Sequence, residues 1–219
     1  MNGFAFLSKA YHATDPSFNG RVTVPVLWDK ETKRIVSNSD DDLMRMLNSE
    51  WSDFAESDYD FYPADLREEI DALNDVIYKR VNNGVYRAGF ATRQQPYERA
   101  AGRLFETLDE LDARLARQRY LLGARQTESD WRLFPTLIRF DAVYHGHFKC
   151  NLRRIADYPN LWPYLRDLYQ HGNVAATVNL DHIKRHYYVT HDEINPTRIV
   201  PISPALNLEA PHGREHLGR

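Results

Sequence analysis

Cysteine is almost absent from this sequence, which holds one such residue, Cys150, among 219. A single thiol excludes an intrachain disulfide, and a free cysteine suits a reducing compartment. No apolar run approaches the roughly 18 residues that a membrane span needs, and the first residues lack the charged and apolar regions of a secretory signal. We therefore expect a cytoplasmic protein that does not enter a membrane.

An excess of charge of one sign is also lacking: Lys and Arg together number 28, Asp and Glu 31, and the net charge is −3. The two signs are interspersed along the chain, so no basic face is expected for nucleic acid or for an anionic membrane. The hydrophobic share of 42% is typical of a globular protein with a real core. We find no internal repeat and no low-complexity segment.

The region 21–38 has the pattern of a β-hairpin. β-Branched and aromatic side chains alternate along its first strand: Val22, Val24, Val26 and Trp28. Pro25 is tolerated near the start of a strand or at a sheet edge, and the Val24–Pro25 bond can adopt the cis form. A polar turn leads to a second strand at 34–38, and a helix is predicted to open at Ser39.

From Pro63 onward the apolar spacing changes from a period of two to a period of 3.6. One face of a long amphipathic helix is formed by residues three and four positions apart: Leu66, Ile70, Leu73, Ile77 and Val81. The sequence at 82–84 is a possible end of this helix. After a loop at 93–96, similar spacing predicts a second helix over 97–115, packed against the first.

Thr127 and Asp130 form a variant of the capping box, which predicts a helix start. The segment that follows is apolar enough for the centre of a helical bundle. Further helices are predicted at 161–169 and 174–186. Beyond Asn195-Pro196 the proline-rich tail is predicted to run extended over the surface.

A hairpin with a candidate cis-proline, followed by an all-helical region with a capping box at its central helix, resembles the glutathione transferase architecture. Longer stretches of sequence that match a family, called matching words below, narrow the resemblance to the glutathionyl-hydroquinone reductases, the Xi class of glutathione transferases. These words are residues 22–30, 83–92, 140–144, 147–151, 182–188 and 194–196. They are distributed over nearly the whole chain.

The resemblance implies a mainly α fold with a partial thioredoxin-like α/β unit at 1–54. An all-helical C-terminal domain with an extended tail is implied for 60–219. Family members dimerise mainly through the helical domain, so a homodimer is expected. They also carry a longer N-terminal part with a Cys-Pro-Trp motif. Because this sequence lacks that motif, we expect a truncated thioredoxin-like unit.

In the family, a cysteine thiolate attacks the sulfur of a glutathionyl-hydroquinone, the hydroquinone leaves, and glutathione resolves the mixed disulfide. The resemblance therefore implies an enzyme, a glutathione-dependent reductase or transferase with glutathione as co-substrate. Because the thiolate is indispensable to this route, the 219-residue chain itself is expected to be inactive. The alternative is a non-catalytic remnant that serves as a helical dimer or as a module that binds aromatic ligands.

The resemblance also assigns glutathione-binding positions in the first unit. Val24, next to Pro25, matches the residue whose backbone pairs with the cysteinyl part of glutathione. Ser39 and Asp40 match a Glu-Ser pair that receives the γ-glutamyl end of glutathione at a helix N-terminus. For these two residues, helix capping is an equally good interpretation. The carboxylate of Asp40 is expected to repel the ligand's own carboxylate and to weaken binding.

Tyr86 and Tyr187 match tyrosines that line the hydroquinone pocket in the family. A phenol at such a place can hydrogen-bond a quinol oxygen and stabilise the phenolate that develops, which makes both residues catalytic candidates. The alternative is that they are ordinary half-buried tyrosines at helix contacts. The long matching words around both residues favour the pocket.

Histidines form two groups in the sequence, the first at 182, 186 and 191 and the second at 145 and 147, close to Cys150. Neither group has the closed four-ligand pattern or the His-Glu-x-x-His signature of a zinc site, so no metal is expected. Cys150 is expected to be a small buried hydrophobic residue rather than a substitute nucleophile.

Overall fold

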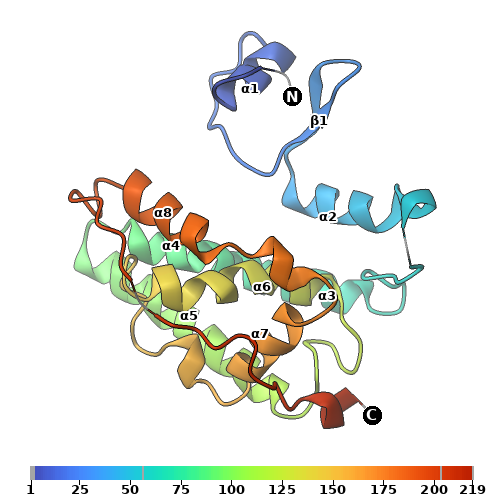
Figure 1. Ribbon diagram of the computed structural model, residues 1–219, viewed down its shortest axis with the longest axis vertical. Coiled ribbons are helices and arrows are strands. Elements are labelled where there is room, and N and C mark those ends of the chain that lie inside the picture. Colours follow the sequence, from blue (N-terminus) through green and yellow to red (C-terminus); the bar gives the residue numbers. More distant parts are fainter. Residues whose placement is uncertain (1–2, 56, 203, 219) are drawn as a thin grey trace. The chain divides into compact units, whose positions relative to one another are not determined.

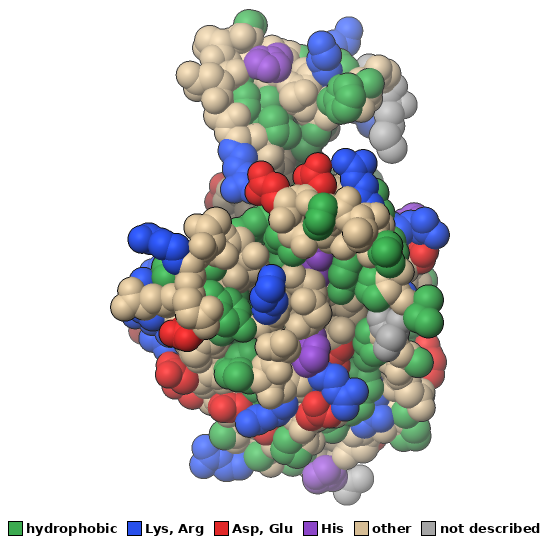
Figure 2. All heavy atoms as spheres, turned by 90° about the vertical axis from the view of Figure 1, so that its left-hand side faces the viewer, with side chains coloured by type: hydrophobic (Ala, Val, Ile, Leu, Met, Phe, Trp, Pro, Cys, Tyr) green, Lys and Arg blue, Asp and Glu red, His purple; other side chains and the backbone are tan. Residues whose placement is uncertain are grey.

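The computed structural model describes residues 3–55, 57–202 and 204–218 (Figure 1). The chain divides into two compact units, Met1–Tyr62 and Pro63–Arg219, and each is described here by itself. Among the described residues, no helix is long and apolar enough to cross a membrane. On the face that Figure 2 shows, acidic and basic side chains are interspersed across the second unit, as the sequence predicts.

The first unit contains a two-stranded antiparallel hairpin. Its elements are α1 (Ser8–Thr14), β1 (Leu27–Asp29), β2 (Arg34–Ser37), α2 (Asp40–Ser49) and the 3-10 turn η1 (Ser52–Phe54). Trp28 pairs with Ile35 in the hairpin. Asp29 organises the turn, because its two carboxylate oxygens accept hydrogen bonds from the Glu31 N–H at 2.8 Å and the Thr32 hydroxyl at 2.6 Å. The predicted hairpin and the predicted helix after Ser39 are confirmed.

The first strand is shorter than the sequence predicts, since it begins at Leu27 rather than at Val22. The cause lies in α1, a helix that the sequence analysis missed. The Tyr11 hydroxyl donates to the Thr23 carbonyl at 2.9 Å, so the chain before Pro25 bonds to α1 instead of a neighbouring strand. Pro25 has no N–H to offer to a ladder. Its bond to Val24 is cis, as predicted.

Among its described residues, the second unit has helices and no strand, apart from one isolated β-bridge between Tyr120 and Gly123. In chain order it contains α3 (Arg67–Val76), η2 (Ile77–Asn82), α4 (Asn83–Gly89), α5 (Gln94–Leu115), α6 (Glu128–Arg139), η3 (Phe140–Tyr144), η4 (Ile155–Asp157), α7 (Leu161–Tyr169), η5 (Val174–Thr177), α8 (Leu180–Thr190) and η6 (Glu215–Gly218). The segments η2 and η3 are π-helical, and η4 to η6 are 3-10 turns. Together with the small hairpin, these elements confirm the predicted mainly α fold.

The predicted first helix of this unit does not end at 82–84. It runs through η2 into α4, because Asn82 turns its side chain toward α6 instead of capping the helix. Its amide donates to the Arg132 carbonyl at 3.1 Å and to the Thr136 hydroxyl at 2.7 Å. Gly84 packs close to Leu104 of α5. Tertiary bonds therefore override the local stop signal.

Helix α6 lies at the centre of the bundle, as predicted, and packs against α3, η2 and α7. Its capping box is present: the Thr127 N–H donates to the Asp130 carboxylate at 2.7 Å. The same carboxylate accepts from the Leu121 N–H at 2.9 Å and the Tyr164 hydroxyl at 2.7 Å. Leu133 is fully buried one turn further on. One acidic side chain thus joins the start of α6 to α7 and to the preceding loop.

The described part of the C-terminal tail before η6 runs without helix or strand and is mostly exposed, as predicted, but Leu208 and Arg214 are buried and anchor it. One guanidinium nitrogen of Arg214 donates to the carbonyl oxygens of Leu115 at 3.0 Å, Gln118 at 2.8 Å and Arg119 at 2.9 Å. These carbonyls lie at and just after the end of α5, where helices need donors. Figure 1 shows this segment in red, running back across the bundle.

The last helix also starts later than predicted. Val174 opens only a short 3-10 turn, and α8 begins at Leu180. The reason is local, since the side chain of Asn179 accepts a hydrogen bond from the His182 N–H at 2.9 Å and caps the helix there.

Candidate aromatic ligand site

Three tyrosines from distant parts of the second unit bring their hydroxyl groups together. Tyr86 comes from α4, Tyr144 from the end of η3 and Tyr187 from α8. The oxygen of Tyr187 lies 2.6 Å from that of Tyr86 and 2.8 Å from that of Tyr144. The two tyrosines selected from the sequence are therefore in direct contact. Tyr144 was not selected, although it lies in one of the matching words.

The three phenols range from partly exposed to buried. Tyr86 is 37% exposed, Tyr187 5% and Tyr144 2%. Burial, followed by the proximity of Tyr187 and Tyr86, raises the pKa of Tyr144 well above its ordinary value. Burial also raises the pKa of Tyr187. Both buried residues therefore remain protonated at neutral pH and can donate hydrogen bonds.

Aromatic rings surround the outermost of these hydroxyls. The ring of Tyr86 lies 6.5 Å from that of Phe90, nearly parallel to it, and 5.4 Å from that of Phe148. Phe148 also contacts Phe90 at 5.3 Å. Because Phe90 is 44% exposed, this group of rings reaches the surface of the unit. A flat aromatic ligand is suited to such a surface.

Gly89 makes room for this arrangement. A Cβ atom at that position would lie 2.2 Å from two ring atoms of Phe148, a distance that real Cβ atoms do not show. The absence of a side chain at the end of α4 therefore lets Phe148 reach Tyr86. Gly89, Phe90 and Phe148 were not selected as site residues, although all three lie within the matching words at 83–92 and 147–151.

A pair of histidines adjoins the aromatic rings. His147 Nε2 lies 3.2 Å from His191 Nδ1, and the His191 ring lies 5.1 Å from Phe90. Burial lowers the pKa of His147 to about 4, and burial lowers that of His191 as well. Both rings are therefore neutral at physiological pH. No group of three or more His, Cys, Asp or Glu residues suited to a metal ion occurs in the part of the chain that the structure describes.

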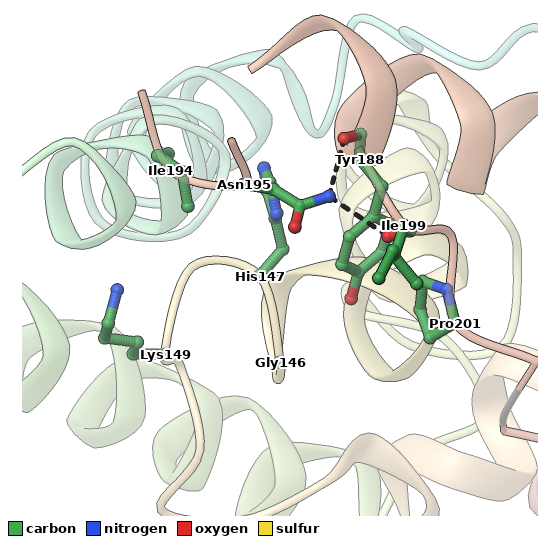
Figure 3. Close-up of a pocket in the computed structure, with 8 residues that line it drawn as sticks. All are labelled: Gly146, His147, Lys149, Tyr188, Ile194, Asn195, Ile199 and Pro201. Carbon is green, nitrogen blue, oxygen red and sulfur yellow. Dashed lines mark hydrogen bonds between the residues drawn. The ribbon is translucent and has the colours of Figure 1, made fainter. Parts of the chain in front are cut away.

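A shallow pocket of about 380 Å³ lies beside His147 (Figure 3). Lys149 and Tyr188 supply further polar groups, and Ile194, Ile199 and Pro201 are among the apolar residues of its lining. Its wall is held by Asn195, whose amide donates to the carbonyls of Tyr188 at 2.7 Å and Ile199 at 3.0 Å. The matching word at 194–196 thus contains a residue that fixes the path of the chain.

The candidate glutathione residues lie in the first unit. Val24 is 76% exposed. No hydrogen bond from its backbone to another residue is found within the described ranges. The hydroxyl of Ser39 accepts from the Asp42 N–H at 3.3 Å, so Ser39 caps α2, and Asp40 is the first residue of that helix. The capping interpretation holds for Ser39, and a contact with glutathione remains a prediction for both residues.

The only cysteine of the chain is not a nucleophile. Cys150 is fully buried, and its thiol donates to the Phe148 carbonyl at 3.8 Å. Burial raises the pKa of this thiol to about 12. Since the thiolate is the reactive species, Cys150 is inert at neutral pH, as the sequence predicts.

Comparison with known proteins identifies relatives of the whole chain. A model of the glutathione S-transferase C-terminal domain matches residues 94–167. The glutathionyl-hydroquinone reductase PcpF of Sphingobium chlorophenolicum is 54% identical over 208 residues, which are 95% of this chain and 66% of that protein. The chain thus spans slightly less than two thirds of that relative.

Solved structures give the same result. The glutathione-bound structure of YqjG, a glutathione transferase homologue from Escherichia coli, has a TM-score of 0.93 at 50% identity and is matched over 95% of this chain and 68% of its own. The Xi glutathione transferase of Phanerochaete chrysosporium has a TM-score of 0.90 at 48% identity, over 93% of this chain and 70% of its own. The chain therefore belongs to the Xi class of glutathione transferases.

Proposed function

We propose that this protein acts in the glutathione-dependent reduction of glutathionyl-hydroquinones and that its second unit binds the hydroquinone ring. The observation that carries the proposal is the contact between the hydroxyls of Tyr86 and Tyr187. The aromatic rings next to them supply a surface for a flat ring, and the phenols supply a hydrogen bond to its oxygen. The name of the relative from Sphingobium chlorophenolicum supports the same substrate class.

In the proposed reaction, a thiolate attacks the sulfur of the conjugate and forms a disulfide with it. The carbon–sulfur bond breaks, its electron pair passes to the ring carbon, and that carbon takes up a proton. Glutathione thiolate then resolves the disulfide. A phenol hydrogen-bonded to the ring oxygen stabilises negative charge that develops there. Because Cys150 is inert, the 219 residues supply binding groups for this reaction and no attacking thiolate.

Glutathione is the proposed co-substrate, held by the first unit. The exposed backbone of Val24 next to Pro25 offers an N–H and a C=O for the cysteinyl part of the tripeptide. The start of α2, at Ser39 and Asp40, is the proposed place for its γ-glutamyl carboxylate, because the N-terminus of a helix attracts anions. The glutathione-bound structure of the relative from Escherichia coli supports glutathione as the ligand. We expect weak binding because of the Asp40 carboxylate.

Binding of menadiol to the 219-residue chain, measured by calorimetry, tests the ring site. We expect Tyr86→Phe and Tyr187→Phe each to weaken binding about fivefold or more, the usual effect of losing one hydrogen bond. Tyr158→Phe is the control, because this buried tyrosine makes no hydrogen bond to Tyr86, Tyr144 or Tyr187. Unchanged affinity in the Tyr86→Phe, Tyr187→Phe double variant would contradict the proposal.

We further propose a homodimer formed through the helical unit and a cytoplasmic location. The dimer is supported by the family and by the frequency of twofold assemblies among soluble proteins. The location is supported by the free thiol of Cys150. Sedimentation velocity at micromolar concentration tests the dimer, and a monomer under those conditions would refute it.

A further inference from the structure

The three tyrosine hydroxyls form a hydrogen-bonded chain, and its end at the buried Tyr144 is called the closed end. Tyr187 Oη is the hydrogen-bond partner closest to Tyr144 Oη, at 2.8 Å. Tyr144 is 2% exposed, so water does not replace a missing partner. Tyr187, in the middle, bonds to both of the other hydroxyls, and the partly exposed Tyr86 forms the open end.

Counting protons sets the direction of this chain. Each phenol has one hydrogen to donate. The acceptor nearest to the buried hydroxyl of Tyr144 is Tyr187, at 2.8 Å, and a buried donor without an acceptor is unfavourable. Tyr144 therefore donates to Tyr187, and Tyr187, whose oxygen is now an acceptor for Tyr144, donates to Tyr86. The hydrogen of Tyr86 is left for a ligand.

We propose that this closed chain makes Tyr86 a fixed hydrogen-bond donor, so that the site selects ligands by an acceptor oxygen, a phenolate or a quinone carbonyl, over neutral phenols. The inference rests on the proposed function and deepens it by naming the form of the ring oxygen. A neutral phenol that donated to Tyr86 would use the second lone pair of that oxygen and leave the Tyr86 hydrogen without an acceptor, so a ligand oxygen that accepts is preferred. Tyr144 and Tyr187 are thus positioning residues that act through Tyr86.

The surroundings of the chain agree with an anionic oxygen. Among the groups that act on Tyr187 are Tyr86, Tyr144 and the cation of Arg139. His191 packs against Tyr187 at 5.4 Å and is itself neutral, with His186 and His147 beside it. Successive hydrogen bonds in one direction polarise each other, which strengthens the outermost one toward a charged acceptor.

Binding of 4-nitrophenol tests this directly, because its phenolate absorbs visible light and its phenol does not. The full 219-residue chain is titrated with the probe at several pH values near neutrality. We expect the bound probe to have a pKa about one unit below that of the free probe, equivalent to a roughly tenfold preference for the phenolate.

Two variants test the chain itself. Tyr187→Phe disconnects Tyr86, whose hydroxyl then turns freely, and the pKa of the bound probe should return to that of the free probe. Tyr144→Phe leaves Tyr187 as the closed end with one bond fewer, so an intermediate shift is expected. Tyr158→Phe changes a buried tyrosine that makes no hydrogen bond to these three residues, and it should keep the full shift.

The outcomes separate the two proposals. If the unaltered chain does not bind the probe, the aromatic ligand site and the proposed function are wrong. If the probe binds with an unchanged or raised pKa, or if Tyr187→Phe keeps the full shift, the fixed direction of the tyrosine chain is wrong while the ligand site stands.

Discussion

At the scale of single residues, the site depends as much on a missing side chain as on those present. The tyrosines supply the polar groups, and Gly89 supplies the space that lets Phe148 lie against Tyr86. The inert Cys150 follows Phe148 by two positions, and its thiol donates to the Phe148 carbonyl. Two substitutions follow from these roles.

Gly89→Ala should disrupt the aromatic rings. The new Cβ would collide with the Phe148 ring at 2.2 Å, so that ring must move away from Tyr86. We expect a loss of about 1–3 kcal/mol of unfolding free energy, typical of overpacking, and weaker menadiol binding. Urea denaturation and calorimetry measure the two effects.

Gly102→Ala is the matched control for Gly89→Ala. It also lies in a helix, but nothing outside that helix's own backbone would come within 4 Å of a Cβ added there. Alanine should stabilise that helix by up to about 1 kcal/mol. Equal effects of the two substitutions would contradict the steric role of Gly89.

Cys150 should neither react with thiol reagents nor support reductase turnover. With a pKa of about 12, its thiolate is scarce at neutral pH, and the side chain is fully buried. We expect iodoacetamide to modify it only after denaturation. In an assay with glutathionyl-menadiol, the chain should be inactive. Turnover that Cys150→Ser abolishes would show this assignment to be wrong.

At the scale of helices and strands, the elements predicted well were those with their signals in their own sequence. The capping box at Thr127 and Asp130 and the apolar spacing of α5 and α7 were sufficient. Predictions failed where distant partners decide the outcome. Tyr11 draws Thr23 away from a strand, and Asn82 bonds to α6 instead of ending its own helix.

The site was predictable to the same extent. Tyr86 and Tyr187 were selected through the words that surround them, and their hydroxyls are in contact, while their role toward a ligand stays a prediction. Tyr144 and Phe148 lay in similar words, but neither residue type nor spacing separates them from ordinary core aromatics. Their roles follow from the convergence of three helical segments, which a local pattern does not contain.

Asp130→Ala should be strongly destabilising, because one carboxylate serves α6, α7 and the loop at Leu121. Its removal leaves two buried N–H groups and the Tyr164 hydroxyl without an acceptor. We expect a loss of about 3 kcal/mol or more in chemical denaturation. Asp109→Ala is the control: its ion pair with Arg153 is exposed, so the change should be below about 1 kcal/mol.

At the scale of the whole molecule, stability should fall as the solution becomes mildly acidic. The folded protein holds the pKa of His147 at about 4, and an unfolded histidine has an ordinary pKa of about 6.5. Below that ordinary value, His147 is protonated in the unfolded chain while it is still neutral in the folded chain. The contribution of His147 to the free energy of unfolding is complete above about pH 6.5. It decreases as the pH is lowered and becomes constant below the pKa of the folded state.

The expected loss from His147 is up to about 3 kcal/mol, and His191, whose pKa is also lowered, acts in the same direction. Urea denaturation between neutral pH and the folded pKa of His147 measures it. His147→Gln should flatten the pH dependence, while His182→Gln, at an exposed position, should leave it unchanged. If the free energy of unfolding of His147→Gln depended on pH as in the unaltered chain, other groups would cause the loss of stability in acid.

The bond of Arg214 to the end of α5 also has a consequence for the order of events during synthesis. Arg214 follows Leu115 by 99 positions, so a ribosome completes α5 and every helix packed on it long before this arginine exists. Until Arg214 has been synthesised, those carbonyls are open to water. The end of α5 is therefore bonded late in folding, and a premature stop codon before this codon would produce a chain that can never form these bonds.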